Sequence, residues 1–458
     1  MRRILLLLCL CAWTAFSQYV RVSPRDARYL EYSDGKPYIP IGLNMIAPPG
    51  GAGAKEDEAF AVFESWLKNL SANGGNYIRV WLSNPFWEVE HRRSGEYDAE
   101  RARRIDRMLE LCRRYGIRVK MTMEHFRSIL EPATQKWAAR PLHHVSQGGP
   151  AQSIADFFDG EASRAQFRRK IRWFADRYGD REEIYGWELW NEINAVRGGD
   201  YLTWTEIMLQ ELHRAFPKNL AMQSLGSFDT PRVREIYRKH SLMPGNDLAQ
   251  VHRYLDLGAS LEVCKGPVDI LAADAIREIL SYQPGKPAIL AESGAVEPRH
   301  TGPFKLYAAD KAGIILHDVL FAPFFAGSAG SGQIWHWDAY VAKNNLWRQF
   351  AMFAETVKGL DPPAENFAAS VEEQGRLRVY KLKGRKTTLA WCRDMRNNWR
   401  AELEQGIPPE TLRGLTVKLD GATTVRVFDP WSGKWSTAKA RRGQIKLPDF
   451  SRSIVVRY

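Results

Sequence analysis

The feature that most constrains the fold is an alternation of short apolar runs with longer amphipathic segments, from about residue 38 to residue 361. Short apolar runs are typical of buried strands, and the segments between them have the period of helices. Strands that alternate with helices predict parallel pairing, because each helix returns the chain to the same end of the sheet. The eight predicted strands are Tyr38–Asn44, Tyr77–Leu82, Val119–Glu124, Ile184–Asn191, Leu220–Leu225, Leu248–Tyr254, Ala288–Glu292 and Gln333–Trp337.

The predicted helices complete this repeat. Eight strands that are each followed by a helix predict a closed α/β structure, the (β/α)8 or TIM barrel, rather than an open sheet. Several helices end before a glycine, as at Gly116 and Gly179, which is a common way to stop a helix. The predicted helices are Glu58–Ala72, Arg101–Tyr115, Gln166–Tyr178, Trp204–Phe216, Thr230–His240, Val268–Tyr282, Asp310–Phe325 and Leu346–Gly359.

The connections differ in length on the two ends of the predicted barrel. Helix-to-strand connections are short, as at 116–118 and 217–219, whereas strand-to-helix connections such as 46–57, 83–97 and 125–163 are long. Long loops of this second kind meet at the face of a barrel where active sites lie. The longest carries Trp137, His143 and His144, and we expect it to wall a substrate cleft.

After residues 361–363 the pattern changes to short strands separated by turns. The predicted strands are Leu377–Leu382, Thr387–Arg393, Leu415–Leu419, Thr424–Phe428 and Ile454–Val456, with a hairpin over 429–435. They indicate a small antiparallel, β-sandwich-like domain packed against the barrel, for which a structural role is favoured over sugar binding. The chain therefore divides into residues 1–17, 18–362 (barrel) and 363–458 (C-terminal β domain).

Residues 1–17 have the pattern of a secretory signal peptide. Arg2 and Arg3 precede an apolar run over 4–12, and small residues follow at 15 and 17, so we expect the mature chain to begin at Gln18. A lipoprotein signal through Cys11 is disfavoured because leucine precedes it. No later segment is long and apolar enough for a membrane span. The sequence thus predicts a secreted or periplasmic protein without an integral membrane segment after signal removal.

Three cysteines remain after residue 17, namely Cys112, Cys264 and Cys392, and they are far apart. This spacing is neither a disulfide framework nor a zinc site, and it leaves open one bridge or three free thiols. Removal of Arg2 and Arg3 lowers the formal charge from +12 to +10. A basic surface can favour acidic polysaccharide, but a solvated surface is the simpler interpretation. No motif for nucleic-acid binding accompanies it.

Motifs for other hydrolases and for cofactors are absent from the sequence. His143-His144 is the only adjacent histidine pair, and no HExxH motif accompanies it. No G-x-S-x-G turn follows a predicted strand, which argues against a serine esterase. We therefore expect neither a metal nor a cofactor.

Two glutamates lie at the ends of predicted strands that are not adjacent in the chain. Glu192 closes the motif Gly-Trp-Glu-Leu-Trp-Asn-Glu at the end of the fourth strand, and Glu292 ends the seventh. In a parallel barrel both side chains reach the same mouth. Hydrolysis of a glycosidic bond needs an acid for the leaving oxygen and a carboxylate on the opposite face of the sugar. Asn191, beside Glu192, suits a hydrogen bond to the sugar 2-hydroxyl.

At these residues the sequence resembles clan A of the retaining glycoside hydrolases, typified by family 5, the cellulase and mannanase family. The resemblance covers nearly the whole barrel, from Asp34 to Trp337, and implies an acid/base at Glu192 and a nucleophile at Glu292. It also implies substrate-binding or supporting roles for further residues: Arg79, His125, His252, Tyr254 and Trp335, with Trp337 as a competitor for the place of Trp335.

The implied supporting roles have physical reasons. Arg79 would keep the nucleophile ionised by charge pairing, Tyr254 would orient it, and Trp335 would form the floor under the reacting sugar. His252 would assist the acid/base or a hydroxyl group. The chain departs from the family where Ile193-Asn194 follows Glu192 in place of the frequent proline, and in the richer sequence over 335–338. These departures put the subfamily and the substrate in doubt.

Three other carboxylates lie in or shortly after predicted strands. Glu188 lies mid-strand and is expected to be a buried, paired support, and Glu124 is expected to support rather than react. Glu297 would compete only if Glu292 faced away from the mouth. The sequence thus predicts a retaining hydrolase of a β-linked oligosaccharide or polysaccharide. A non-catalytic carbohydrate-binding protein on a degenerate barrel and a transglycosylase remain the alternatives, and the sugar, endo or exo action and oligomeric state stay open.

Overall fold

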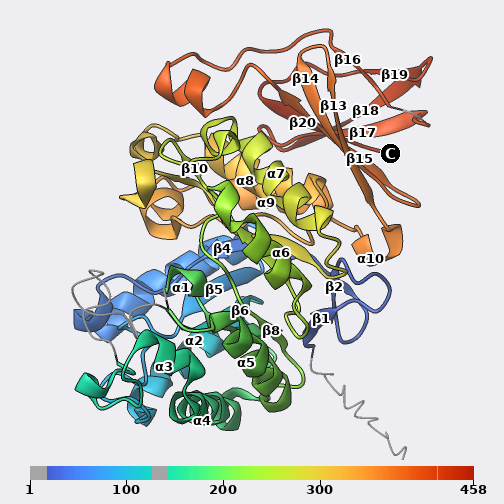
Figure 1. Ribbon diagram of the computed structural model, residues 1–458. Helices are drawn as coiled ribbons and strands as arrows, with labels where there is room; N and C mark the ends of the chain where they lie inside the picture. Colours follow the sequence, from blue (N-terminus) through green and yellow to red (C-terminus); the bar gives the residue numbers. More distant parts are fainter. Residues whose placement is uncertain (1–17, 126–141, 197, 420) are drawn as a thin grey trace, which may run out of the picture.

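The computed structural model describes residues 18–125, 142–196, 198–419 and 421–458. The predicted signal peptide and Trp137 lie outside these residues. The described chain forms a barrel of strands and helices, with a small sheet at its N-terminal end and a β domain packed on one side (Figure 1).

Five strands make one continuous parallel sheet on one side of the barrel. They are β4 (Gly42–Asn44), β5 (Tyr77–Trp81), β6 (Arg118–Glu124), β7 (Ile184–Trp190) and β8 (Leu220–Met222), hydrogen-bonded in that order. On the other side, β9 (Ala249–His252) pairs in parallel with β11 (Ala288–Glu292). The Asp247 amide donates to the Ala221 carbonyl at 2.9 Å, which links β8 to the segment entering β9.

The prediction of a regular eighth strand over Gln333–Trp337 is wrong. The structure has only single parallel bridges there, from Ile334 to Leu43 and to Ser293. The Asn44 amide donates to the Ile334 carbonyl at 3.0 Å, so this short segment still closes the barrel. Trp337 itself begins a wide helical turn over Trp337–Ala342, which ends the extended backbone early.

Helices surround the strands at the predicted places. They are α1 (Glu56–Ala72), α2 (Ala99–Arg114), α4 (Glu161–Tyr178), α5 (Tyr201–Ala215), α6 (Arg234–Leu242), α7 (Val268–Ser281), α8 (Ile314–Phe325) and α9 (Arg348–Val357). The Asp98 carboxylate caps α2 by accepting hydrogen bonds from the Glu100 and Arg101 amides. An additional short helix, α3 (Ile154–Asp159), lies in the longest loop.

The N-terminal sheet was not predicted. β1 (Val20–Val22), β2 (Leu30–Tyr32) and β3 (Pro37–Tyr38) form an antiparallel sheet before the barrel. The predicted first strand, Tyr38–Asn44, is split between β3 and β4. Pro40 lies at the break, where it has no amide to donate to a neighbouring strand.

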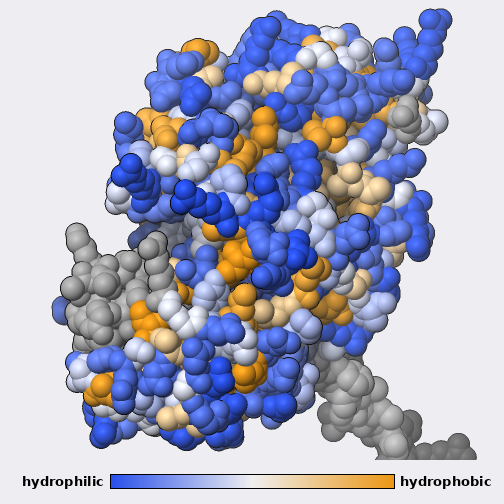
Figure 2. All heavy atoms as spheres, in the orientation of Figure 1, coloured by the Kyte–Doolittle hydropathy of each residue, from blue (hydrophilic) through white to orange (hydrophobic). Residues whose placement is uncertain are grey.

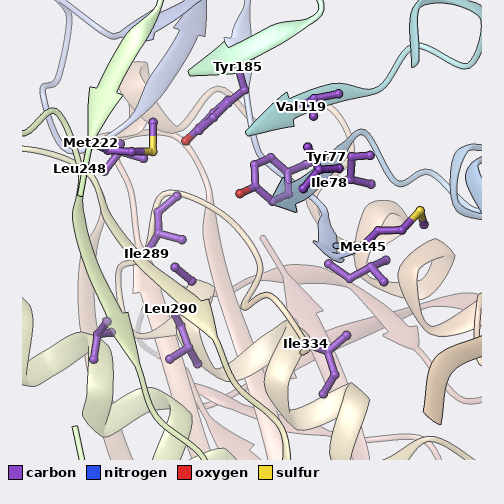
Figure 3. Packing of buried hydrophobic residues seen from close by; sticks show 14 of the residues in the cluster. Met45, Tyr77, Ile78, Val119, Tyr185, Met222, Leu248, Ile289, Leu290 and Ile334 are labelled. Atoms are coloured by element: carbon purple, nitrogen blue, oxygen red, sulfur yellow. The ribbon is translucent and has the colours of Figure 1, made fainter. Parts of the chain in front are cut away.

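One apolar core fills the barrel and extends under the C-terminal domain. Figure 3 shows buried side chains from successive strands and from the closing segment, among them Ile78, Met222, Leu290 and Ile334. Each of these four side chains is inaccessible to solvent. Their burial stabilises the strands on both sides of the barrel.

The C-terminal domain is one antiparallel sheet of eight strands, which curls around a core of its own. Two strands, β13 and β19, were missed in the sequence, and β18 was predicted only as part of a hairpin. β13 is mostly exposed and lacks an apolar alternation, so its pairing with β14 is what holds it. The strands are β13 (Ala368–Gln374), β14 (Leu377–Lys383), β15 (Thr388–Asp394), β16 (Thr416–Lys418), β17 (Thr424–Asp429), β18 (Lys434–Arg441), β19 (Gln444–Lys446) and β20 (Ser453–Arg457).

This domain contacts the barrel through a buried, mixed interface. The Trp391 ring lies 5.7 Å from the Phe321 ring of α8 and is inaccessible to solvent. Arg393 forms a buried ion pair with Asp318 of α8 at 2.9 Å. Tyr380 donates to Asp269 of α7 at 2.9 Å. The predicted boundary at 362/363 falls inside the short helix α10 (Pro362–Glu365), between these two packed parts.

Two surface properties follow from the described residues. Cys112, Cys264 and Cys392 are all free and buried, which decides between the two possibilities left open for the cysteines. The visible face is mostly hydrophilic, with apolar side chains scattered in small groups (Figure 2). Within the described parts of the chain, no helix has the length and apolarity to span a membrane.

Candidate active site

A cavity of about 870 Å³ opens where the barrel strands end. Its wall includes both predicted catalytic carboxylates, Glu192 and Glu292. Other side chains of the wall are Trp81, Asn191, Asp229, Tyr254, Arg299, His300, Trp335, His336 and Trp337. The two predicted catalytic carboxylates therefore face one common space, so Glu297 is not needed as a replacement for Glu292.

Glu292 is buried at the end of β11, with 3% of its surface exposed. One carboxylate oxygen forms an ion pair with the Arg79 guanidinium. The other accepts a hydrogen bond from the Tyr254 hydroxyl at 2.7 Å. A positive charge and a hydroxyl donor both stabilise the ionised carboxylate, and they hold it in one orientation.

Glu192 lies directly after β7 in a left-handed backbone conformation, with φ 52° and ψ 54°. This conformation is rare for a residue with a β-carbon, and it costs free energy that the surrounding structure must offset. The Glu192 side chain is 22% exposed and lies 2.9 Å from Nδ1 of His252. The same His252 nitrogen lies 3.4 Å from Glu292, so this imidazole stands between the two carboxylates.

Buried charged side chains on the continuous sheet, namely Arg79, Lys120 and Glu188, lie below the two carboxylates and are called the ionic floor here. Arg79 donates to Glu188 through Nη2 at 2.6 Å and to Asn191 at 2.7 Å. Thr122 also donates to Glu188, at 2.6 Å. Burial alone would raise the pKa of Glu188, but the charges of Arg79 and Lys120 and the hydrogen bond from Thr122 lower it below its usual value. Glu188 is therefore a buried, paired support, as its place in the sequence predicts.

Lys120 completes this floor. Its ammonium group donates to Gln250 at 2.5 Å and lies 3.4 Å from Glu188. Burial lowers the pKa of Lys120 to about 7, against the opposing effect of Glu188. A lysine that is 1% exposed at the base of an active site is unusual, because burying its charge is costly.

Aromatic rings form one wall of the cavity. The Trp335 ring lies 5.2 Å from Trp81 and 5.8 Å from Trp337, and both Trp335 and Trp337 are partly exposed. Such faces can stack on a sugar ring. His125 lies behind this aromatic wall, where its ring stacks on Trp81. Its Nδ1 is hydrogen-bonded to the Ser83 hydroxyl at 2.6 Å. The structure thus brings together every predicted site residue except His125, which contacts the wall from behind.

Glu124 has the supporting place expected for it. It forms an ion pair with Lys170 of α4 and lies 3.3 Å from His143, which follows the undescribed segment of the longest loop. Burial would raise the pKa of Glu124, and Lys170 and His143 lower it. This buried cluster fixes the loop to α4 and does not line the cavity described above.

Several residues of the cavity wall were missed in the sequence. Trp81 follows Arg79 by two positions on β5, so strand alternation could have placed it on the same inner face. Asp229, His300 and His336 lie in loops or turns, and no residue pattern marks them. Burial lowers the pKa of His336 to about 4, so its imidazole is neutral near pH 7.

Three groups of side chains have metal-ligand atoms within 4.8 Å of one another among the described residues. One is Glu192, His252 and Glu292, and another is Glu90, Glu124 and His143. In the second, the Lys170 ammonium already lies 2.9 Å from Glu90 and pairs with Glu124, which supplies the balancing cation. The third group, Asp229, Asp256 and His300, lies in and behind the cavity wall.

The fold is shared with glycoside hydrolases of known structure. A proposed glycoside hydrolase from Bacteroides vulgatus superposes on 96% of this chain and 82% of its own, with a TM-score of 0.55 at 14% identity. An α-amylase from Anoxybacillus covers 91% of this chain and 97% of its own, with a TM-score of 0.55 at 12% identity.

A family 5 glycoside hydrolase from Streptomyces cattleya, solved with GlcNAc, covers 71% of this chain and 82% of its own, with a TM-score of 0.51 at 15% identity. The described barrel therefore has the fold of TIM-barrel glycoside hydrolases, with family 5 among them. No family model and no curated protein matches the chain by sequence. At these identities the likeness concerns the fold alone.

Proposed function

We propose that this protein is a retaining glycoside hydrolase that cleaves a β-linked oligosaccharide or polysaccharide, with Glu192 as acid/base and Glu292 as nucleophile. The observation that carries the proposal is the facing pair itself. A carboxylate oxygen of Glu192 and one of Glu292 lie within 4.8 Å of each other, across a cavity large enough for sugar units. Retaining enzymes hold their carboxyl groups about 5–5.5 Å apart, and inverting ones about 6.5–9.5 Å.

The first chemical step forms an ester. A Glu292 oxygen attacks the anomeric carbon while the glycosidic C–O bond breaks, and Glu192 donates its proton to the leaving oxygen. The leaving alcohol departs, and a glycosyl–Glu292 ester remains. Arg79 and Tyr254 support this step because an ion pair and a hydrogen bond hold the Glu292 carboxylate in one orientation before the attack.

The second step releases the sugar. Glu192, now ionised, takes a proton from water, and the water oxygen attacks the anomeric carbon. The ester bond breaks and Glu292 leaves as a carboxylate. Two inversions give net retention of the anomeric configuration. Partial exposure of Glu192 suits this exchange of protons with water and leaving group, whereas the buried Glu292 suits covalent attack.

Secretion belongs to the same proposal. The apolar run over 4–12 after Arg2 and Arg3 supports export, and the mature enzyme would begin at Gln18 and act outside the cytoplasm. Polymeric sugars are found there. We also propose the division into a barrel over 18–362 and a β domain over 363–458, with the β domain as a structural partner through its buried contacts with α7 and α8.

The test is a screen of polysaccharides and aryl glycosides with the wild type and Glu292→Gln. The glutamine is nearly isosteric but cannot attack, so we expect turnover to fall by about 10⁴-fold or more while sugar binding remains. Proton NMR of the first product gives the stereochemistry, and the inverted anomer would exclude this mechanism. Sugar binding without any turnover by the wild type would leave the non-catalytic alternative, and products extended by an added acceptor sugar would identify a transglycosylase.

A further inference from the structure

A polar group in the cavity wall is not used by the chemistry above. Asp229 follows β8, Asp256 ends β10 (Leu255–Asp256), and His300 lies in the turn after β12 (Ala295–Val296). Asp229 and His300 line the cavity, and Asp256 lies behind them with 2% of its side chain exposed. Loops of three different strands thus bring these groups to one place.

The three side chains face one another without making hydrogen bonds to one another. Nε2 of His300 lies 3.6 Å from Asp256 Oδ2 and 3.9 Å from Asp229 Oδ2, which is too far for a hydrogen bond. Asp256 Oδ1 accepts from the Gly258 and Arg299 amides at 2.7 and 3.1 Å. Asp256 Oδ2 faces His300 Nε2, so the carboxylate presents one oxygen to the backbone of the turn and the other to the imidazole.

The backbone holds this arrangement in place at a cost. Arg299 and His300 have φ values of 63° and 58°, in the left-handed region that residues other than glycine rarely occupy. The Asp256 carboxylate accepts the Arg299 amide and so supports the strained turn. Strain of this kind is found where a binding site fixes a side chain.

The position of the group relative to the nucleophile indicates what it can bind. The His300 ring stands edge-on against Tyr254, with 5.1 Å between ring centres, and the Tyr254 hydroxyl reaches Glu292. The group is therefore one aromatic side chain away from the reacting carboxylates. This is the place of a neighbouring sugar unit rather than of the anomeric carbon.

The chemistry of the group matches neutral hydroxyls. Each sugar hydroxyl can donate to a carboxylate and accept from an imidazole or guanidinium, and the wall offers both kinds through Asp229, His300 and Arg299. Burial raises the pKa of Asp229, only partly offset by His300, so the free carboxylate is poorly compensated. Hydroxyl donors would compensate it.

We propose that Asp229 and His300, positioned by Asp256, bind the hydroxyl groups of a second sugar unit next to the one cleaved between Glu192 and Glu292. This inference rests on the proposed function and adds a specificity site to it. The enzyme would then distinguish an oligosaccharide from a single sugar carrying an artificial leaving group.

The experiment compares two substrates that carry the same reacting sugar. One is a 4-nitrophenyl monoglycoside, and the other is a β-linked oligosaccharide of three or more units. The variants are Asp229→Ala and His300→Ala, with Asp180→Ala as the matched control, because Asp180 is 91% exposed and pairs with Lys218 away from the cavity. We expect about a tenfold loss of kcat/KM on the oligosaccharide, mainly in KM, and less than about twofold on the monoglycoside. Asp180→Ala leaves both unchanged.

Other outcomes overturn the inference. Equal losses on both substrates would mean a structural role, and no loss on either would mean that the group does not touch substrate. Calorimetric titration of the EDTA-treated protein with ZnCl2 tests whether the group binds a cation instead. Tight Zn²⁺ binding that is lost in Asp229→Ala would show a metal site and overturn the sugar site. If the wild type hydrolyses no glycoside, the proposed function fails. Oligosaccharide binding to the wild type and to Asp229→Ala then still decides the sugar site separately.

Discussion

The two halves of the barrel differ in regularity and in what they contribute. The half from β4 to β8 is a continuous parallel sheet, whereas the half from β9 onward has two short strand pairs, β9 with β11 and β10 with β12, and a closing segment held by single bridges. The regular half carries the buried charges Arg79, Lys120 and Glu188, each at most 1% exposed. The irregular half contributes partly exposed groups of the wall, such as His300 and Trp337.

This difference follows from what each task requires. Buried charges are tolerated where their partners are fixed, as neighbouring strands fix them here, because an unpaired charge in the core is strongly destabilising. Recognition of a sugar requires side chains that project beyond the strand ends, where loops follow the hydrogen-bonded strands. Glu192 lies after the last residue of β7 and Glu292 ends β11, so the proposed acid comes from one half and the proposed nucleophile from the other.

The largest expected effect that tests this division concerns Glu192. Glu192→Gln removes the proton donor, so kcat/KM on a substrate with a poor alkoxide leaving group should fall by about 10³- to 10⁴-fold. A dinitrophenyl glycoside needs no protonation to leave, and its first step should be slowed by less than about tenfold. Pre-steady-state release of dinitrophenol measures that step. A loss of equal size on both substrates would contradict the acid role.

The next largest effect concerns Arg79, which belongs to the ionic floor of the regular half. Arg79→Lys keeps the charge but loses the fork that reaches Glu188, Asn191 and Glu292 together. We expect kcat to fall by about 10²- to 10³-fold. The free energy of unfolding should fall by about 2–3 kcal/mol, because buried acceptors lose their donors. Steady-state kinetics and urea denaturation measure these quantities. Arg177→Lys, in a surface pair with Asp106, is the control and should change neither.

A smaller effect concerns the pH dependence of stability through Lys120. Its pKa is about 7 in the folded protein and near 10.4 in an unfolded chain. Between these values the unfolded state binds more protons, so this lysine makes stability rise with pH over that range. Below about pH 7 the full cost of the buried charge is present. Lys120→Met lacks this contribution, so the stability of the wild type relative to the variant should increase from pH 7 to pH 10.

Urea denaturation of both proteins at several pH values measures that difference. Lys218→Met, at a lysine that is 52% exposed and pairs with Asp180, is the matched control and should not reproduce the rise. A difference between wild type and Lys120→Met that stays constant from pH 7 to pH 10 would contradict the lowered pKa of Lys120.

The smallest effect concerns the aromatic wall of the irregular half. Trp337→Ala removes a partly exposed ring beside Trp335, and we expect KM for an oligosaccharide to rise about three- to tenfold with little change in kcat. Trp337→Phe should restore most of the affinity. If kcat falls instead while KM is unchanged, the ring acts on the reacting centre rather than on binding.

The regular half could be predicted from the sequence because each buried strand is apolar and is followed by an amphipathic helix. The meeting of Glu192 and Glu292 at one cavity could be predicted too, since Glu292 ends such a strand and Glu192 closely follows one. The closing segment was predicted too long, because the aromatic-rich sequence over 333–337 does not reveal that only Ile334 bridges its neighbours. The N-terminal sheet and β13 were missed because their strands are very short or exposed.

The wall residues could not be predicted for a further reason. Asp256 and His300 are 44 positions apart and meet only because two turns pack together, one of them in a strained conformation. A polar residue in a loop looks the same in the sequence whether it faces solvent or a cavity. Three-dimensional packing alone distinguishes the two, which is why the proposed site for a second sugar unit could not be inferred from the sequence.

The most direct test of the account is to trap the ester that it places on Glu292. In a 2-deoxy-2-fluoro glycoside with a dinitrophenyl leaving group, fluorine slows both steps because it destabilises the cationic transition states. The reactive leaving group restores the rate of formation alone, so the ester accumulates. Mass spectrometry of the digested enzyme should show one added fluoroglycosyl group on the peptide that contains Glu292, and none in Glu292→Gln. A label on another residue, or turnover without any label and with inversion at the anomeric carbon, would contradict the central claim.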